Sequence, residues 1–136
     1  MSVNGEIVFS ISDFNLEFQE IKNNILINNY AIIRKGQSIG ILKDKKAPYD
    51  IWSCEIELSE LDSINDKLLE LLKALLPYSI FINKISHRYQ QVCVDIYLRS
   101  EYGQIGFSLN KEIYSFLDRL GVQINFHILS FGKVED

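Results

Sequence analysis

Two histidines and two cysteines are the residues of this chain best suited to chemistry. His87 and His127 are the only histidines, and Cys54 and Cys93 are the only cysteines. Neither histidine accompanies a serine or a cysteine in a recognised nucleophile motif, and the cysteines lack the C-x-x-C spacing of metal sites. The glycines form no phosphate-binding pattern. The sequence therefore carries no catalytic signature, and we expect no enzyme activity, no metal and no cofactor.

Acidic and aromatic residues recur on one side of several predicted strands. Successive side chains of a strand point to opposite faces of its sheet, so alternate residues share a face. If the apolar residues of each strand face the helices, the other face carries five candidate partner-binding residues: Glu55, Glu57, Asp95, Tyr97 and His127. That face is either solvated or a protein-binding surface. A metal site at Glu55, Asp95 and His127 is a third option if their strands are neighbours.

A second candidate site surrounds the longest irregular stretch, residues 35–49. Irregular stretches of this length in compact domains are often functional. A small-molecule pocket at this stretch would be lined by Arg34, Gly36, Tyr49, Trp52 and Arg99. Two other interpretations stay open: the lysines at 43, 45 and 46 belong to a solvated loop, and Trp52 is a core anchor.

Hydrophobic periodicity predicts the elements that position these residues. A period of two predicts strands at 6–12, 30–34, 50–58, 88–99 and 122–128, with Phe107 and Leu109 ending a further strand. Helical spacing predicts helices at about 13–24, 63–76 and 111–120. The stretch 78–85 fits either a helix or a short strand.

Capping residues mark the ends of these helices. Ser59, Asp62 and Ser63 are candidate caps of the second helix, and Asn110 of the last one. Pro77 ends the second helix because its ring disfavours helical geometry in the preceding residue. Gly121 suits a left-handed stop.

The element order β-α-β-β-α-β-(β)-α-β predicts a single α+β domain, residues 1–136. We expect an antiparallel or mixed sheet with helices packed on one face, a variant of the ferredoxin-like fold. Phe116, Leu117, Ile124 and Phe126 should be buried together in its core. Cys54 and Cys93 should leave the sheet on opposite faces, beyond disulfide reach.

Composition limits the function classes. The chain has 136 residues, 47% of them hydrophobic, with a net charge of -4 and a pI near 5.2. An acidic chain does not neutralise phosphates, so we expect no nucleic-acid partner. No apolar stretch approaches the roughly 20 residues of a membrane span, so we expect no membrane partner. We expect a cytoplasmic protein with reduced thiols and a basic protein partner, in an oligomeric state that the sequence leaves open.

Several short motifs occur together: Arg34-Lys35-Gly36, Trp52 after the long loop, the leucine-rich helix ending at Pro77, Gly106-Phe107-Ser108-Leu109 and Leu120-Gly121. Together they resemble a bacterial domain-of-unknown-function family, number 4279. The resemblance implies a small stand-alone α+β domain without established catalytic residues. It also implies a class often encoded beside polymorphic toxins, in which small acidic proteins serve as immunity factors. The leading hypothesis is thus a non-catalytic immunity protein of a toxin–antitoxin kind; the alternative is a small-molecule sensor or enzyme with its pocket near Trp52 and residues 35–49.

Overall fold

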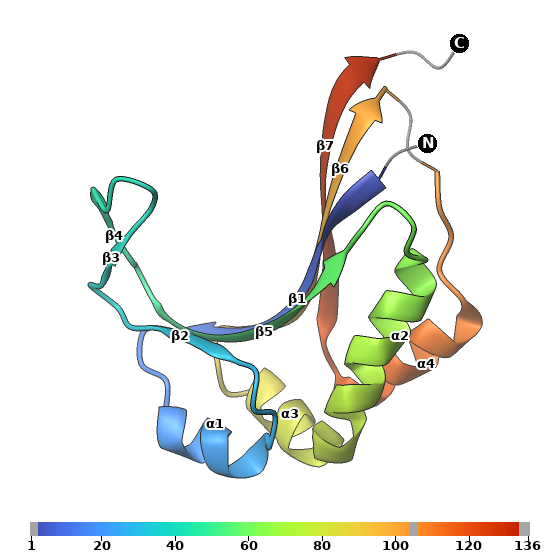
Figure 1. Ribbon diagram of the computed structural model, residues 1–136. Helices are drawn as coiled ribbons and strands as arrows, with labels where there is room; N and C mark the ends of the chain where they lie inside the picture. Colours follow the sequence, from blue (N-terminus) through green and yellow to red (C-terminus); the bar gives the residue numbers. More distant parts are fainter. Residues whose placement is uncertain (1–2, 104–105, 134–136) are drawn as a thin grey trace.

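The computed structural model describes residues 3–103 and 106–133 (Figure 1). In chain order the elements are β1 (Val3–Asp13), α1 (Phe18–Asn24), β2 (Ala31–Ile33), β3 (Ser38–Ile39), β4 (Lys45–Lys46), β5 (Asp50–Leu58), α2 (Ile64–Leu75), the 3-10 helix η1 (Leu76–Tyr78), α3 (Ser79–Ser86), β6 (Gln91–Tyr102), α4 (Lys111–Leu120) and β7 (Gln123–Lys133).

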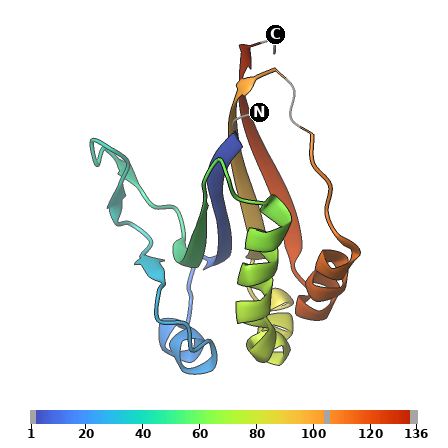
Figure 2. The same ribbon diagram turned by 45° about the vertical axis from the view of Figure 1, so that its right-hand side comes forward.

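The main sheet has five strands in the order β2-β5-β1-β6-β7. β1 is central and antiparallel to both β5 and β6, whereas β6 and β7 are parallel. Parallel neighbours need a crossover connection, and α4 lies within it. The helices all lie on one side of the sheet (Figure 2). The predicted α+β class, with a mixed sheet and helices on one face, is confirmed.

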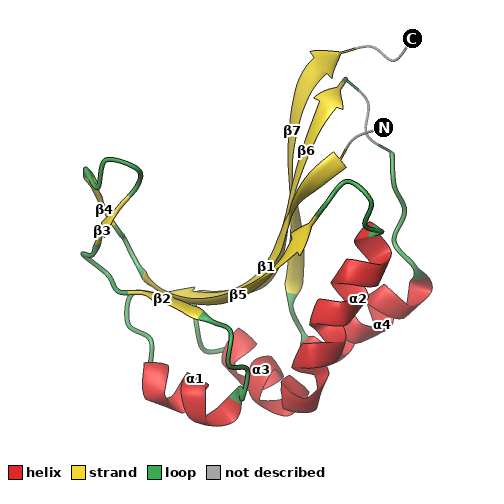
Figure 3. Ribbon diagram, viewed as in Figure 1, coloured by secondary structure: helices red, strands yellow, loops and turns green. Residues whose placement is uncertain are grey.

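The sheet is strongly curved, and its uncovered face is the concave one (Figure 3). The helices line the convex side, while the small β3–β4 hairpin rises on the concave side at one end. At the other end, β6 and β7 extend beyond the helices. The stretch 35–49, expected to be irregular, therefore contains a short hairpin, which turns through left-handed conformations at Gly40 and Lys43.

The core lies between the sheet and the helices, and Trp52 is the largest of its fully buried side chains. The Trp52 side chain is fully buried, with its ring stacked on Tyr30 at 5.6 Å and edge-on to Phe9 at 6.1 Å. Its Nε1 has no hydrogen-bond partner within the described residues, so packing alone holds the ring. Trp52 is a core anchor, one of the two interpretations left open by the sequence. The other core residues come from alternate positions of the strands and from one face of the helices, and they include Ile7, Ile11, Val94, Ile96, Leu68, Leu72, Leu75 and Ile82.

Most helix ends follow the predicted capping chemistry. The Ser63 side chain accepts a hydrogen bond from the Asp66 backbone N–H, and Gly121 ends α4 with a φ of 69°. α2 ends at Leu75, close to Pro77 as predicted, but the predicted reason is wrong, because Leu76 before the proline keeps helical angles (φ -57°, ψ -38°). The chain continues through η1 into the ambiguous stretch, which is the helix α3. Asn110 is the N-cap residue of α4, as predicted, but the predicted side-chain hydrogen bond is not formed. Its backbone N–H donates to Asn65 Oδ1 at 2.8 Å.

The predicted burial of Phe126 is also wrong. Phe126 is on the helical face, opposite Ile96 of β6, but its side chain is 39% exposed. β7 is an edge strand with a neighbouring strand on one side only, and the Phe107 ring lies against Phe126 at 5.5 Å between centroids. Residues 106–110 form no strand, contrary to the expectation at Phe107 and Leu109. Leu117 is buried as predicted, whereas Phe116 and Ile124 are half-buried.

We therefore expect Phe126→Ala to lower the free energy of unfolding by only about 1 kcal/mol, since little apolar area leaves the interior. Urea titration of dilute protein, followed by far-UV circular dichroism, measures this value. A loss above about 3 kcal/mol would place Phe126 in the core after all.

Candidate functional site

The concave sheet face carries the five residues that the sequence singled out. Strand pairing aligns them in rows: Glu57, Glu6, Tyr97 and His127 lie side by side across β5, β1, β6 and β7. Glu55, Val8, Asp95 and Asn125 form the adjacent row. The alternation of each strand, read from the sequence, places these side chains opposite the core. The five candidates therefore share one face, though not one contact cluster.

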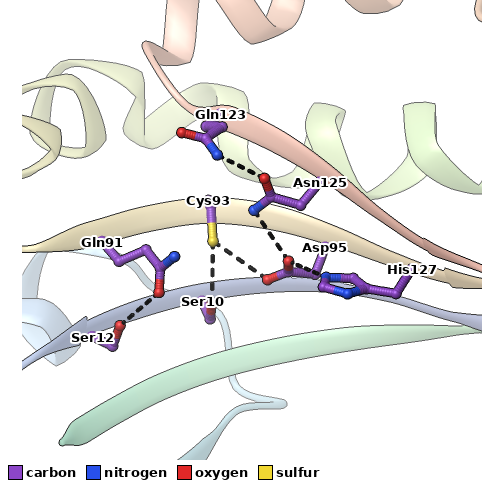
Figure 4. Close-up of polar contacts among 8 residues, drawn as sticks. All are labelled: Ser10, Ser12, Gln91, Cys93, Asp95, Gln123, Asn125 and His127. Atoms are coloured by element: carbon purple, nitrogen blue, oxygen red, sulfur yellow. Dashed lines mark hydrogen bonds and ion pairs between the residues drawn. The ribbon is translucent and has the colours of Figure 1, made fainter.

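Asp95 is the centre of a hydrogen-bond network on β6 and β7 (Figure 4). One carboxylate oxygen, Oδ1, lies 2.8 Å from His127 Nε2 and accepts from Asn125 Nδ2 at 3.2 Å. The other, Oδ2, accepts from Cys93 Sγ at 3.3 Å. These partners satisfy a carboxylate that is only 15% exposed, as a half-buried charge requires. Asp95 thus holds His127 and Asn125 in fixed orientations.

Tyr97 and His127 form an exposed aromatic pair beside this network. Their rings stack at 4.5 Å with an interplanar angle of 13°. Partial burial, with the negative charge of Asp95 nearby, raises the pKa of Tyr97, so its hydroxyl stays protonated at neutral pH. A rigid ring pair with a polar tip is the kind of surface that protein interfaces favour.

Cys93 lies on the same face, but it is poorly suited to nucleophilic chemistry. Its thiol is in contact with Ser10 Oγ at 3.7 Å and with Asp95, as Figure 4 shows. Burial is the main reason why the pKa of Cys93 is raised to about 11, so the thiol stays protonated. Cys54 is in the core on the other side of the sheet, where burial raises its pKa to about 12. Both cysteines are free, as predicted.

A hollow of about 410 Å³ opens at one end of the concave face. Arg99 and Glu6 line this hollow and form a bidentate ion pair, with nitrogen–oxygen distances of 2.7 and 3.3 Å. Arg99 Nε also donates to Asn4 Oδ1 at 3.2 Å. Glu55 and Glu57 line the same hollow, are exposed and form no ion pair in the described part of the chain. The carboxylates of these two residues are therefore available to a partner.

Glu6 also lies on the concave face, although it was not among the residues predicted there from the sequence. It precedes Val8 by two positions, so the alternation of β1 already placed it there. Its pairing with Arg99 depended on the order β5-β1-β6, which the alternation alone does not reveal.

Glu55, Asp95 and His127 do not come together as the metal site that the sequence left open. Glu55 and Asp95 flank Val8 from opposite sides, which separates their backbones by two strand spacings, about 10 Å. Only Asp95 and His127 are in contact. Among the residues described, no group of three or more His, Cys, Asp or Glu side chains is arranged to hold a metal.

The alternative pocket residues do not come together either. The guanidinium of Arg34 lies over the Phe18 ring at 4.8 Å, and Tyr49 contacts Phe14 at 5.0 Å between centroids. Trp52 is inside the core. Arg99 pairs with Asn4 of β1 on the opposite face, far along the strand from Trp52, which pairs with Ile11. Gly36 is in a left-handed turn with a φ of 87°, and a Cβ there would meet open space.

Fold and face together define a small α+β domain with an uncovered, acidic sheet surface. A family model, Domain of unknown function (DUF4279), matches residues 3–131, and the chain belongs to this family. No curated protein and no solved structure gives a match. Within the described residues, every helix is too short or too polar to cross a membrane.

Proposed function

We propose that this chain is a non-catalytic protein-binding domain that takes its partner on the concave sheet face. Most concretely, it is a bacterial immunity protein that neutralises a toxin by direct complex formation. The observation that carries the proposal is the concave face itself, which none of the described helices covers. This face carries two exposed carboxylates on β5 and a stacked aromatic pair on β6 and β7. The toxin is suggested by the gene setting that the family resemblance implies.

The parts of this face have different roles in the proposal. Glu55 and Glu57 attract a basic partner, because unpaired surface charges speed association through long-range steering. Tyr97 and His127 form the contact that excludes water, since aromatic side chains held in one orientation lose little entropy on binding. Inhibition follows by occlusion: the acidic face covers the basic surface with which the toxin binds its substrate.

The alternative, a small-molecule sensor or enzyme, has weaker support. Its proposed lining residues are dispersed, and Trp52 is not accessible to a ligand. The hollow beside Arg99 is open and lies within the protein-binding face described above, so it supports that proposal equally well.

Charge reversal at two exposed glutamates tests the proposed face. We expect Glu55→Lys with Glu57→Lys to slow association with the toxin encoded beside the gene by roughly 10-fold or more at low salt, with a smaller effect at high salt. Surface plasmon resonance with an inactivated form of the toxin measures the rates. The fold should be unaffected, because exposed substitutions usually change stability by less than about 0.5 kcal/mol.

A matched variant separates the local effect from net charge. Glu112→Lys with Asp118→Lys changes the net charge equally, but these two acidic residues are exposed on helix α4 at the other side of the sheet. We expect near-normal rates for this control. Equal rates for the two double variants, or full affinity with the sheet-face variant, would rule out the concave face as the toxin-binding surface.

A further inference from the structure

The free edge of β7 is the least protected part of the fold. β7 is 11 residues long and ends the sheet, whereas β2, at the opposite edge, has three residues. Within the described residues, no backbone hydrogen bond joins the outer side of β7 to another segment. Soluble proteins usually protect such an edge with a short strand, a proline, a β-bulge or charged side chains. β7 is long and has no proline, no charged side chain and no register shift between Gln123 and Ser130; its irregularity comes after Ser130.

Apolar side chains are exposed on both faces of this edge strand. Ile128 is on the helical face and is 53% exposed, and Leu129 is on the concave face and is 54% exposed. Phe131 is 62% exposed. Exposed apolar residues scattered singly need no explanation, but a run along an unpaired strand marks an interaction surface. A strand added beside β7 would satisfy its backbone groups and cover these side chains together.

We propose that a second copy of this chain adds that strand, so that two β7 strands pair antiparallel about a two-fold axis into one ten-stranded sheet. A two-fold contact brings the same patch of each copy together, so the patch must be compatible with itself. Residues 123–132 carry no Asp, Glu, Lys or Arg. No like charges would therefore oppose each other there, although the whole chain carries -4.

The symmetry also specifies the register. An axis perpendicular to the sheet keeps each residue on its own face, and directly opposite residues of paired strands share a face. Opposite residues must then both be even-numbered or both odd-numbered, so one residue meets its own copy. Ile128 is the midpoint of β7, and pairing the full strand places it on the axis. His127 would then oppose Leu129, and Phe126 would oppose Ser130, all within the part of β7 that precedes the irregularity after Ser130.

The surrounding structure leaves this edge accessible. The segment that enters α4 runs on the helical side of the sheet, where Phe107 contacts Phe126 (Figures 1 and 2). The β3–β4 hairpin is at the other end of the sheet. The dimer would leave both concave faces uncovered, and it does not depend on the proposed function.

Sedimentation equilibrium over a range of protein concentrations tests the dimer. We expect a species of twice the 15.8 kDa chain mass. Ile128→Lys places two like charges at the axis and should raise the dimer Kd at least 10-fold. The matched control is Leu61→Lys, since Leu61 is 98% exposed and lies outside β7. A monomer at micromolar to millimolar concentrations would overturn the proposal, leaving the edge to a strand of a different protein, as would equal dimer Kd values for the two variants.

Cross-linking keeps the proposal testable if the lysine variant does not fold. Ile128→Cys should form a disulfide-linked dimer under mild oxidation, because Cα atoms of directly opposite residues in antiparallel strands lie about 4.5–5.5 Å apart, within the Cα separation that a disulfide spans. The native thiols at Cys54 and Cys93 are buried and protonated, so they should not compete. Leu61→Cys is the control and should stay uncross-linked. Equal cross-linking of both variants, or none at position 128, would overturn the β7 contact.

Discussion

Phe9→Ala should lower the free energy of unfolding by about 3–5 kcal/mol, the loss typical of a fully buried phenylalanine. Phe9 is on β1, the central strand, where its pairing partners are Cys54 of β5 and Val94 of β6. Its ring is completely buried against the edge of Trp52. Truncation leaves a cavity under the middle of the sheet, and neighbours fixed in ladders on both sides have little freedom to fill it.

Urea titration measures this loss, with Trp52 fluorescence and circular dichroism as two independent probes. Trp52 is the only tryptophan and is fully buried, so its emission should report the exposure of the core. Phe126→Ala is the matched control, because it removes the same atoms from a partly exposed position. Losses of similar size for the two variants would contradict the difference in burial. Domains typically have only 5–15 kcal/mol of stability, so the Phe9 variant could be substantially unfolded at 37 °C.

Gly5→Ala should also be strongly destabilising, by about 3 kcal/mol, at the upper end of the usual range for overpacked sites. A Cβ built on Gly5 would lie 1.7 Å from the Tyr97 carbonyl oxygen and 2.8 Å from the carbonyl carbon. Both atoms belong to the backbone of β6, so no side-chain rotation relieves the clash. β1 and β6 would have to separate where the sheet curves, next to the Glu6–Arg99 ion pair.

Gly106→Ala is the control for Gly5→Ala, because a Cβ at Gly106 would meet nothing within 4 Å. Its free energy of unfolding should stay within about 0.5 kcal/mol of the native value. Thermal unfolding of the two variants under identical conditions compares them directly. A Gly5→Ala protein as stable as the control would mean that the two strands are less closely packed than described.

Local chemistry in the sequence identified β5, α2 and α4 with close boundaries, but α1 begins only at Phe18 and β7 continues to Lys133, five residues beyond the predicted end. The strand at 50–58 matches β5 because alternation there is strict, and α4 ends at Gly121 because a left-handed residue suits glycine. The stretch 78–85 was ambiguous because Ile80, Phe81 and Ile82 are consecutive apolar residues, which suit a buried strand or a helix. Packing against the core decided for the helix α3, in which Ile82 and Ile85 are buried.

The candidate site could be predicted in its membership but not in its contacts. Alternation assigned Glu55, Asp95, Tyr97 and His127 to the face away from the core, and the structure places them there. Which of them touch depends on strand order and register. These bring His127 to Asp95 and Tyr97 across a parallel pair, but put β1 between Asp95 and Glu55.

The sequence by itself determined which face of the sheet each residue occupies, because the two-residue period is a property of the backbone alone. That was sufficient to separate Cys54 from Cys93 and to collect the acidic residues. Only the tertiary structure decided what covers each face. Phe126 and Ile128 follow the core pattern, yet they are 39% and 53% exposed on the edge strand β7. Burial depends on which distant elements pack over a residue, and no local pattern records that packing.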